Sequence, residues 1–198
     1  MARARAHDFE EKQRSILRSA AAVLAEAGMD KASMSQIAAR ADVSKALLYH
    51  YYPGRDALIF DILRTNLVAL EAAVMAADDP DAPPRARLRA LVHAVLEQYR
   101  DADDTHKVQL NATQALPQPQ RDEILAIERR IVRRFAQVIR QINPDLEASR
   151  PILMPVTMSL FGMMNWVYMW FKDGGAVSRA DYADLATDIL LGGIAELR

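Results

Sequence analysis

The chain contains no cysteine, which excludes thiol catalysis, disulfide bonds and thiolate metal sites and suits a reducing, cytoplasmic environment. It also lacks a phosphate-binding glycine loop, a nucleophile elbow and a metalloprotease motif. The only groupings that resemble acid–base or metal sites are His93 with Glu97, and Asp103 and Asp104 with His106. No segment has the alternation of a half-buried strand, and no segment repeats. We therefore expect an all-α protein that is not an enzyme and carries no cofactor.

A net charge of −1 conceals an uneven distribution of charge along the 198 residues. Residues 1–55 carry nine lysines and arginines against six acids, whereas residues 56–198 carry sixteen against twenty. A basic amino-terminal part on an acidic body favours a polyanionic partner at one end of the molecule.

One uncharged run, residues 151–171, is long enough to span a bilayer. Polar residues and helix breakers, among them Pro155 and Asn165, interrupt it, so we expect a helix buried on both sides rather than a membrane segment. An apolar stretch before Ala25-Glu26-Ala27 imitates a signal peptide, but the charged residues that precede and interrupt it exclude that interpretation.

Apolar residues at helical spacing predict a succession of helices. The expected helices cover about residues 10–27, 34–41, 45–51, 55–75, 88–99, 104–115, 119–142, 151–171 and 179–197. Pro155 is expected to kink the first turns of the uncharged helix.

Residues 33–52 form the most informative segment of the sequence. Two short helices are joined by the turn Asp42-Val43-Ser44, and Ser33 and Ser44 stand at the two N-cap positions. The second helix is too polar and aromatic on one side to be entirely core. Such a pair can place one helix in a DNA major groove while the other braces it.

The run Val43-Ser44-Lys45-Ala46-Leu47-Leu48-Tyr49-His50-Tyr51-Tyr52, followed by the helix start Arg55-Asp56-Ala57-Leu58, resembles the TetR (tetracycline repressor) family of bacterial transcriptional regulators. The resemblance covers about residues 12–65. It implies a homodimeric repressor, released from a palindromic operator when a small molecule enters the carboxy-terminal body. Residues 1–54 would be a helix-turn-helix DNA-binding domain and residues 55–198 a helical bundle for ligand binding and dimerisation, linked by the helix at 55–75.

Two departures from the family pattern lie in the reading region. Ala46-Leu47 replaces a frequent Gly-Thr, so that an apolar group stands where a hydroxyl is usual. Gly54-Arg55 replaces a usual Ser-Lys and keeps the positive charge. The base sequence recognised therefore does not carry over.

The side chains of the second short helix divide between core and DNA. Leu48 and Tyr52 are expected in the core, whereas Lys45 and Leu47 are expected to read base edges. By the resemblance, Tyr49 and His50 contact phosphates, although either can be an ordinary surface residue. The complete set of DNA-binding candidates is Arg14, Ser33, Ser35, Ser44, Lys45, Ala46, Leu47, Tyr49, His50 and Arg55. Arg3 and Arg5 lie on an expected arm that either enters a minor groove or is a solvated tail.

The carboxy-terminal half has a narrower resemblance. Residues 160–166 with Trp170 and Gly174-Gly175 resemble TetR members that control fatty-acid and aromatic-acid catabolism. Residues 1–6 and 106–111 are similar to the phenylacetate-degradation repressors, which respond to coenzyme A thioesters. The implied function is repression of a catabolic operon with an acyl-CoA effector such as phenylacetyl-CoA. The alternative is a repressor of an efflux or unrelated metabolic gene that responds to another hydrophobic small molecule.

A ligand cavity is expected between the helices of the body. Its candidate lining residues, each of which can equally be core, are Tyr99, Gln109, Asn111, Phe135, Asn165, Trp166, Met169 and Trp170. The helices at 151–171 and 179–197 are expected to pair with those of a second copy as a four-helix bundle. The arginines at 129, 130, 133 and 134 either bind coenzyme A phosphates or form a solvated helix face. Two other classes of function stay open: a helical enzyme or carrier of hydrophobic metabolites, and a membrane-associated helical protein.

Overall fold

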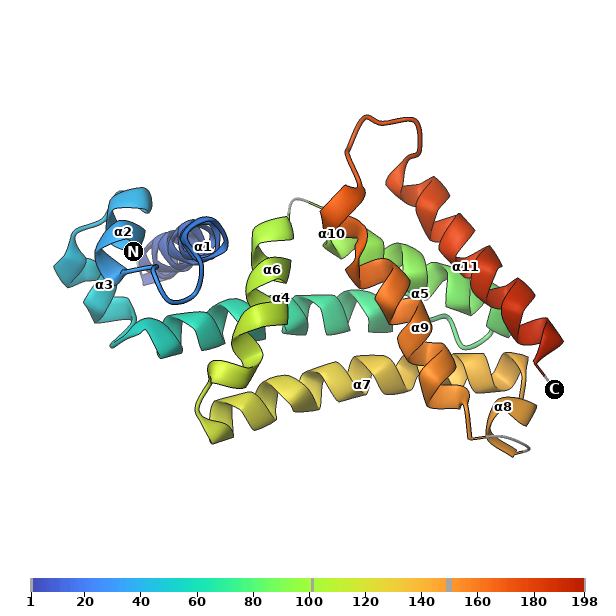
Figure 1. Cartoon of the computed structure of the whole chain (residues 1–198). Helices are drawn as coiled ribbons and strands as arrows, with labels where there is room; N and C mark the ends of the chain where they lie inside the picture. Colours follow the sequence, from blue (N-terminus) through green and yellow to red (C-terminus); the bar gives the residue numbers. More distant parts are fainter. Residues whose placement is uncertain (1, 101, 149–150, 198) are drawn as a thin grey trace. The chain divides into compact units, whose positions relative to one another are not determined.

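The computed structural model describes residues 2–100, 102–148 and 151–197, and every regular element in those ranges is helical (Figure 1). The all-α prediction is confirmed. In chain order the elements are α1 (Ala2–Ala27), α2 (Met34–Arg40), α3 (Lys45–Tyr51), α4 (Arg55–Ala77), α5 (Pro84–Gln98), α6 (Asp103–Ala112), the 3₁₀ turn η1 (Thr113–Ala115), α7 (Gln118–Ile142), α8 (Asp145–Ala148), α9 (Leu153–Asn165), α10 (Val167–Trp170) and α11 (Arg179–Glu196).

The first helix is longer than expected. It begins at Ala2, where the sequence pattern predicted an arm as far as about residue 10. Alanine and arginine alternate over residues 2–6, and both are strong helix formers, so local propensity favours extending the helix. The predicted arm is therefore wrong for the backbone. The side chains of Arg3 and Arg5 lie outside the described residues.

The uncharged segment forms two helices instead of one. Trp166 separates α9 from α10, and the hydroxyl of Tyr182 donates to the carbonyl of Met163 at 3.1 Å. That carbonyl would be the acceptor for Val167 in a continuous helix. Pro155 lies in the first turn of α9, where its missing N–H has no intrahelical role, so the predicted kink is not needed.

The chain divides into two compact units, and α4 and α7 each contribute residues to both. Unit 1 comprises residues 1–67 and 102–125, and unit 2 comprises residues 68–101 and 126–198. This division is a property of packing, and the predicted functional boundary after residue 54 stays a prediction.

Unit 1 is held by the apolar stripes that the sequence pattern indicated. α1 packs against α2 and α6, and α2 packs against α3. Fully buried leucine and isoleucine side chains from these helices and from the first half of α4 form the core, among them Ile16, Leu24, Ile37, Leu48 and Leu58. Burial of each such side chain contributes about 1.5–3 kcal/mol.

Unit 2 is centred on α5, which packs on α11 and α9. Leu88, Leu91 and Val95 are fully buried on α5, and the rings of Phe135 and Phe161 meet edge to face with their centroids 5.0 Å apart. None of the described helices combines the length and the hydrophobicity that crossing a membrane requires.

Candidate functional site

Serine N-caps fix the beginnings of the two short helices. At α2 the backbone N–H of Gln36 donates to Ser33 Oγ at 3.2 Å, and the backbone N–H of Ser33 donates to Gln36 Oε1 at 2.8 Å. At α3 the backbone N–H of Leu47 donates to Ser44 Oγ at 3.1 Å. Both caps satisfy amides that helix starts leave without a backbone partner, as the sequence predicted.

The turn between α2 and α3 passes through a left-handed residue. Asp42 has φ +51°, and the N–H of Val43 donates to the carbonyl of Ala38 at 3.0 Å. Aspartate adopts this backbone region more readily than most residues. The turn therefore ends α2 and starts α3 within three residues, Asp42-Val43-Ser44.

Helix α3 has one buried and one exposed side. Leu48 is fully buried and Tyr52 is 5% exposed, as predicted. Leu47 is half-buried. The residues exposed on the outer side are Ser44, Lys45, Ala46, Tyr49 and His50. A hydroxyl, an ammonium, a phenol and an imidazole on one helix face can all bond to phosphates or base edges.

Tyr52 fastens the end of α3 to two other helices. Its hydroxyl donates to Asp61 Oδ2 on α4 at 2.6 Å and accepts from Gln13 Nε2 on α1 at 3.2 Å. The same Gln13 amide donates to Asp61 Oδ2 at 2.9 Å. Burial and the Asp61 carboxylate raise the pKa of Tyr52 well above its ordinary value, so the hydroxyl keeps its proton. This network sets the orientation of α3 within unit 1.

Sequence reasoning missed Phe9 as a second support. Its ring stacks on that of Tyr51, with centroids 4.7 Å apart and planes 21° apart. The sequence gave no signal for this contact, because the predicted helix began after Phe9.

The residues outside α3 that were predicted to contact phosphates differ in their exposure and in the hydrogen bonds that they already make. Ser33 and Ser35 are exposed, although the Ser33 hydroxyl already serves the α2 cap. Arg14 is exposed on α1. Arg55 is half-buried, and its Nη1 donates to the carbonyl of Met29 at 2.6 Å. Arg55 therefore also holds the loop after α1.

Arg40, which sequence reasoning did not select, lies exposed at the end of α2. Two of its nitrogens donate to the two carboxylate oxygens of Glu26 at 2.9 Å each, so its charge is partly neutralised.

In unit 2, two of the predicted ligand residues meet directly. The hydroxyl of Tyr99 donates to Asn165 Oδ1 at 2.9 Å. Burial, followed by the charge of Glu128, raises the pKa of Tyr99 well above its ordinary value. Phe135 is fully buried against Phe161, in the same unit. These side chains form a polar pair and an aromatic pair inside one core.

The other predicted ligand residues are placed differently. Gln109 belongs to unit 1, where its Oε1 accepts from Asn66 Nδ2 at 3.5 Å. Asn111 lies in α6, but its side chain is outside the described residues. Trp166, Met169 and Trp170 are 58%, 57% and 47% exposed, so they do not line an enclosed cavity of a single chain. The prediction assumed one continuous helix through this stretch, whereas the helix is interrupted at Trp166.

Two of the four arginines in the α7 cluster form ion pairs. Arg130 makes two contacts with the Glu71 carboxylate, at 2.6 and 2.8 Å, and Arg134 pairs with buried Asp78. Arg129 and Arg133 are exposed. The structure thus supports a paired helix face for two of the four arginines. The described residues contain no cluster of three or more histidine, aspartate or glutamate side chains that could hold a metal ion.

A capped pair of short helices, with one exposed polar face on the second helix, is a helix-turn-helix unit. In an all-α chain with a separate helical body, this arrangement defines the class of helix-turn-helix regulators. Two family models match the chain: residues 16–62 match "Bacterial regulatory proteins, tetR family", and residues 81–194 match "Tetracyclin repressor-like, C-terminal domain". The chain belongs to the TetR family of bacterial regulatory proteins.

Individual relatives agree with this assignment. A TetR-family transcriptional regulator from Bordetella parapertussis 12822 superposes with a TM-score of 0.86 and 32% identity, over 94% of this chain and 97% of that one. AibR, solved in complex with isovaleryl coenzyme A and operator DNA, has a TM-score of 0.76 and 26% identity, over 91% of this chain and 98% of that one. The HTH-type transcriptional regulator BetI of Rhizobium meliloti (strain 1021) is 30% identical over 94 residues, 48% of this chain. That alignment spans 46% of the curated relative, less than half its length.

Proposed function

We propose that the protein is a ligand-responsive transcriptional repressor whose α3 helix reads a palindromic operator. The observation that carries the proposal is the two-sided character of α3. Leu48 and Tyr52 anchor one side in unit 1, while Lys45, Tyr49 and His50 stand exposed on the other. In this proposal residues 1–54 bind DNA, and residues 55–198 bind the effector and a second copy.

Exposed apolar side chains on α9 and α11 support pairing of two copies. Met154 and Met158 are 47% and 49% exposed one turn apart on α9, and Leu185 and Ile189 are 51% and 55% exposed one turn apart on α11. Apolar stripes of this kind are typical of surfaces that are covered in an assembly. A twofold dimer would hold two reading helices about 34–36 Å apart, as successive major grooves require.

A mobility-shift assay tests the DNA-binding part. Duplexes selected from a random pool by the wild-type protein supply the operator, and K45A combined with Y49F removes one charge and one hydroxyl from the α3 face. We expect at least about a tenfold loss of affinity, since these contacts contribute about 1–3 kcal/mol. K172A, which removes an exposed lysine outside unit 1, is the matched control and is expected to bind as wild type. If the double variant binds the operator as tightly as wild type, the assignment of the exposed α3 face as the DNA-contacting surface is wrong.

We further propose that the effector is an acyl-CoA and that the controlled genes serve fatty-acid or aromatic-acid catabolism. The support is the neighbour AibR, whose structure holds isovaleryl coenzyme A, together with the polar pair Tyr99–Asn165 beside an aromatic core. A thioester carbonyl needs a hydrogen-bond donor, and the Tyr99 hydroxyl would supply one by exchanging its bond to Asn165 Oδ1 for a bond to the ligand. Another hydrophobic small molecule, with control of an efflux or unrelated metabolic gene, is the competing assignment.

Release of the selected duplex distinguishes the two assignments. Phenylacetyl-CoA and isovaleryl-CoA are titrated against the complex, with free coenzyme A and the two free acids as controls. We expect release by a thioester and not by the controls, and Y99F is expected to weaken release without changing operator affinity. If no thioester releases the duplex and a neutral hydrophobic compound does, the acyl-CoA assignment is wrong while the repressor assignment stands.

A further inference from the structure

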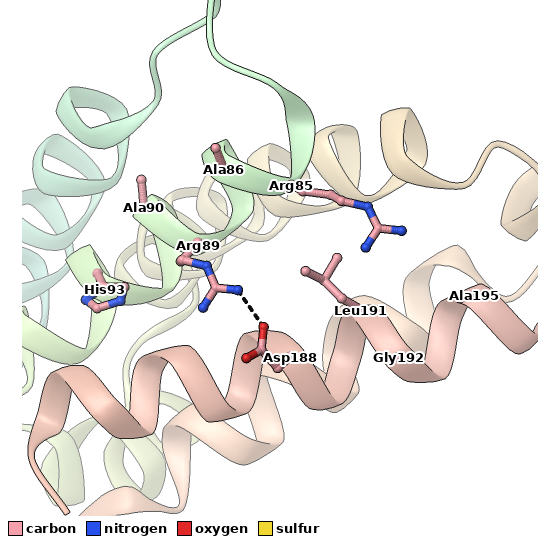
Figure 2. A pocket seen from close by; sticks show the side chains of 9 residues that line it. All are labelled: Arg85, Ala86, Arg89, Ala90, His93, Asp188, Leu191, Gly192 and Ala195. Carbon is pink, nitrogen blue, oxygen red and sulfur yellow. Dashed lines mark hydrogen bonds and ion pairs between the residues drawn. The ribbon is translucent and has the colours of Figure 1, made fainter.

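A groove runs between α5 and α11 on the surface of unit 2, with a volume of about 850 Å³ (Figure 2). One wall comes from the first half of α5 and the other from the second half of α11. Its lining residues are Arg85, Ala86, Arg89, Ala90, His93, Asp188, Leu191, Gly192 and Ala195. The volume lies within the range of about 300–1,000 Å³ that small-molecule sites occupy.

The floor of this α5–α11 groove is apolar. Ala86 and Ala90 stand one turn apart on α5, and Leu191, Gly192 and Ala195 belong to the α11 side (Figure 2). Side chains this small leave room for a hydrocarbon chain or ring to lie along the two helices. Burial of such a group is favourable by about 25 cal/mol per Å² removed from water.

Most polar groups of the groove already take part in hydrogen bonds or ion pairs. Arg89 bridges Asp184 at 2.7 Å and Asp188 at 2.5 Å. His93 Nε2 lies 2.8 Å from Asp184 Oδ1, and these contacts tie α5 to α11 across the groove. Two carboxylates therefore already pair with Arg89, and one of them also bonds to His93.

Arg85 is the cation that is left over. It is exposed, and no carboxylate among the described residues forms an ion pair with it. Its guanidinium extends from α5 toward the end of the groove where Leu191 lies (Figure 2). An unneutralised guanidinium beside an apolar floor is complementary to a group that is anionic at one end and hydrophobic along its length.

We propose that the α5–α11 groove binds an anionic amphiphile, with a carboxylate on Arg85 and an apolar chain over Ala86, Ala90 and Leu191. This site is separate from the Tyr99–Asn165 pair in the core. It adjoins the proposed pairing face. Asp188 follows Leu185 by three residues and Gly192 follows Ile189 by three, so each pair lies about 60° apart around α11, and the α5 side of the groove is the part that lies outside that face.

Decanoate is the probe, and titration calorimetry with amide chemical shifts of the full chain is the measurement. We expect saturable binding with the largest shifts at Ala86, Ala90 and Gly192. R85Q is expected to lose about tenfold in affinity, the ordinary worth of a charged hydrogen bond. R129Q removes the same charge from an exposed site on α7 and is expected to bind as wild type.

Two further arms separate charge from shape. Decanol keeps the chain and lacks the carboxylate, so R85Q is expected to leave its affinity unchanged. A86L fills the floor from an exposed first-turn position and is expected to weaken both probes. Equal binding of decanoate by wild type and R85Q, shifts confined to the Tyr99–Asn165 region, or no binding at all would each overturn the proposal. None of these results depends on whether the protein binds an operator.

Discussion

Replacing Asp78 by asparagine is expected to destabilise unit 2 more than any surface charge substitution. The Asp78 side chain is 0% exposed and stands just after the end of α4. Its two oxygens accept from Arg87 at 2.7 and 3.2 Å, and Arg134 pairs with it as well. Arg87 also donates to Gln141 at 2.9 Å, so the cluster joins the end of α4 to α5 and α7.

The magnitude follows from what the substitution leaves behind. An asparagine amide would put N–H groups toward Arg87, whose side chain is only 9% exposed, and would remove the carboxylate that pairs with both guanidinium groups. Breaking a buried pair by removing one partner costs about 3–5 kcal/mol, because the remaining charge stays desolvated. The control E71Q removes a carboxylate from the more exposed Glu71–Arg130 pair and is expected to cost less than about 1 kcal/mol.

Acid titration gives an independent reading of the same cluster. Burial by itself raises the pKa of Asp78, but the hydrogen bonds and charges of Arg87 and Arg134 outweigh it and hold the pKa below its ordinary value. A depressed folded-state pKa contributes stability above the unfolded-state pKa of about 3.9, and that contribution is lost as the pH falls through the folded-state value. We therefore expect wild type to lose stability below about pH 5, and D78N to lose less over the same interval.

Urea unfolding at one fixed protein concentration measures these differences without confounding them with dimerisation. The free energy of unfolding is compared for wild type, D78N and E71Q at neutral pH and then at decreasing pH. A cost for D78N no larger than that for E71Q would refute the reasoning. So would an acid dependence identical to that of wild type.

Three substitutions test unit 1 by the same unfolding assay. Y52F removes the hydroxyl bonded to half-buried Gln13 and Asp61 and should cost about 1.5–3 kcal/mol. Y49F should cost almost nothing, and equal costs would contradict the role of Tyr52 in holding α3 in place. S44A removes the α3 cap and should cost about 1 kcal/mol of stability. S35A removes no cap, so a larger loss of stability for S35A than for S44A would contradict the capping role of Ser44. L48A leaves a cavity and should cost about 2–5 kcal/mol, and a loss below about 1 kcal/mol would show that Leu48 is not core.

Local patterns were enough to predict the helix-turn-helix unit. Serine caps act on amides two or three residues away, and the buried position of Leu48 follows from helical periodicity. These are short-range effects that one sequence contains in full. The exposed face of α3 was predictable because the side chains of this short helix that do not enter the core must point toward solvent.

Contacts between distant segments were not predictable in the same way. The break at Trp166 coincides with a hydrogen bond from Tyr182, sixteen residues later in the chain, which no local rule indicates. The Asp78 cluster and the α5–α11 groove depend on how helices pack. For the same reason, residues as apolar as Trp166 and Met169 were taken for cavity lining although more than half of each is exposed.

The hydrogen bonds among Gln13, Tyr52 and Asp61 have a mechanical consequence. They tie the last residue of the α3 region to the second turn of α4, and α4 continues without interruption into unit 2. A rotation of α4 about its own axis would therefore carry α3 with it instead of sliding past it. Helix α3 and the first part of α4 are therefore held to each other through the phenol of Tyr52.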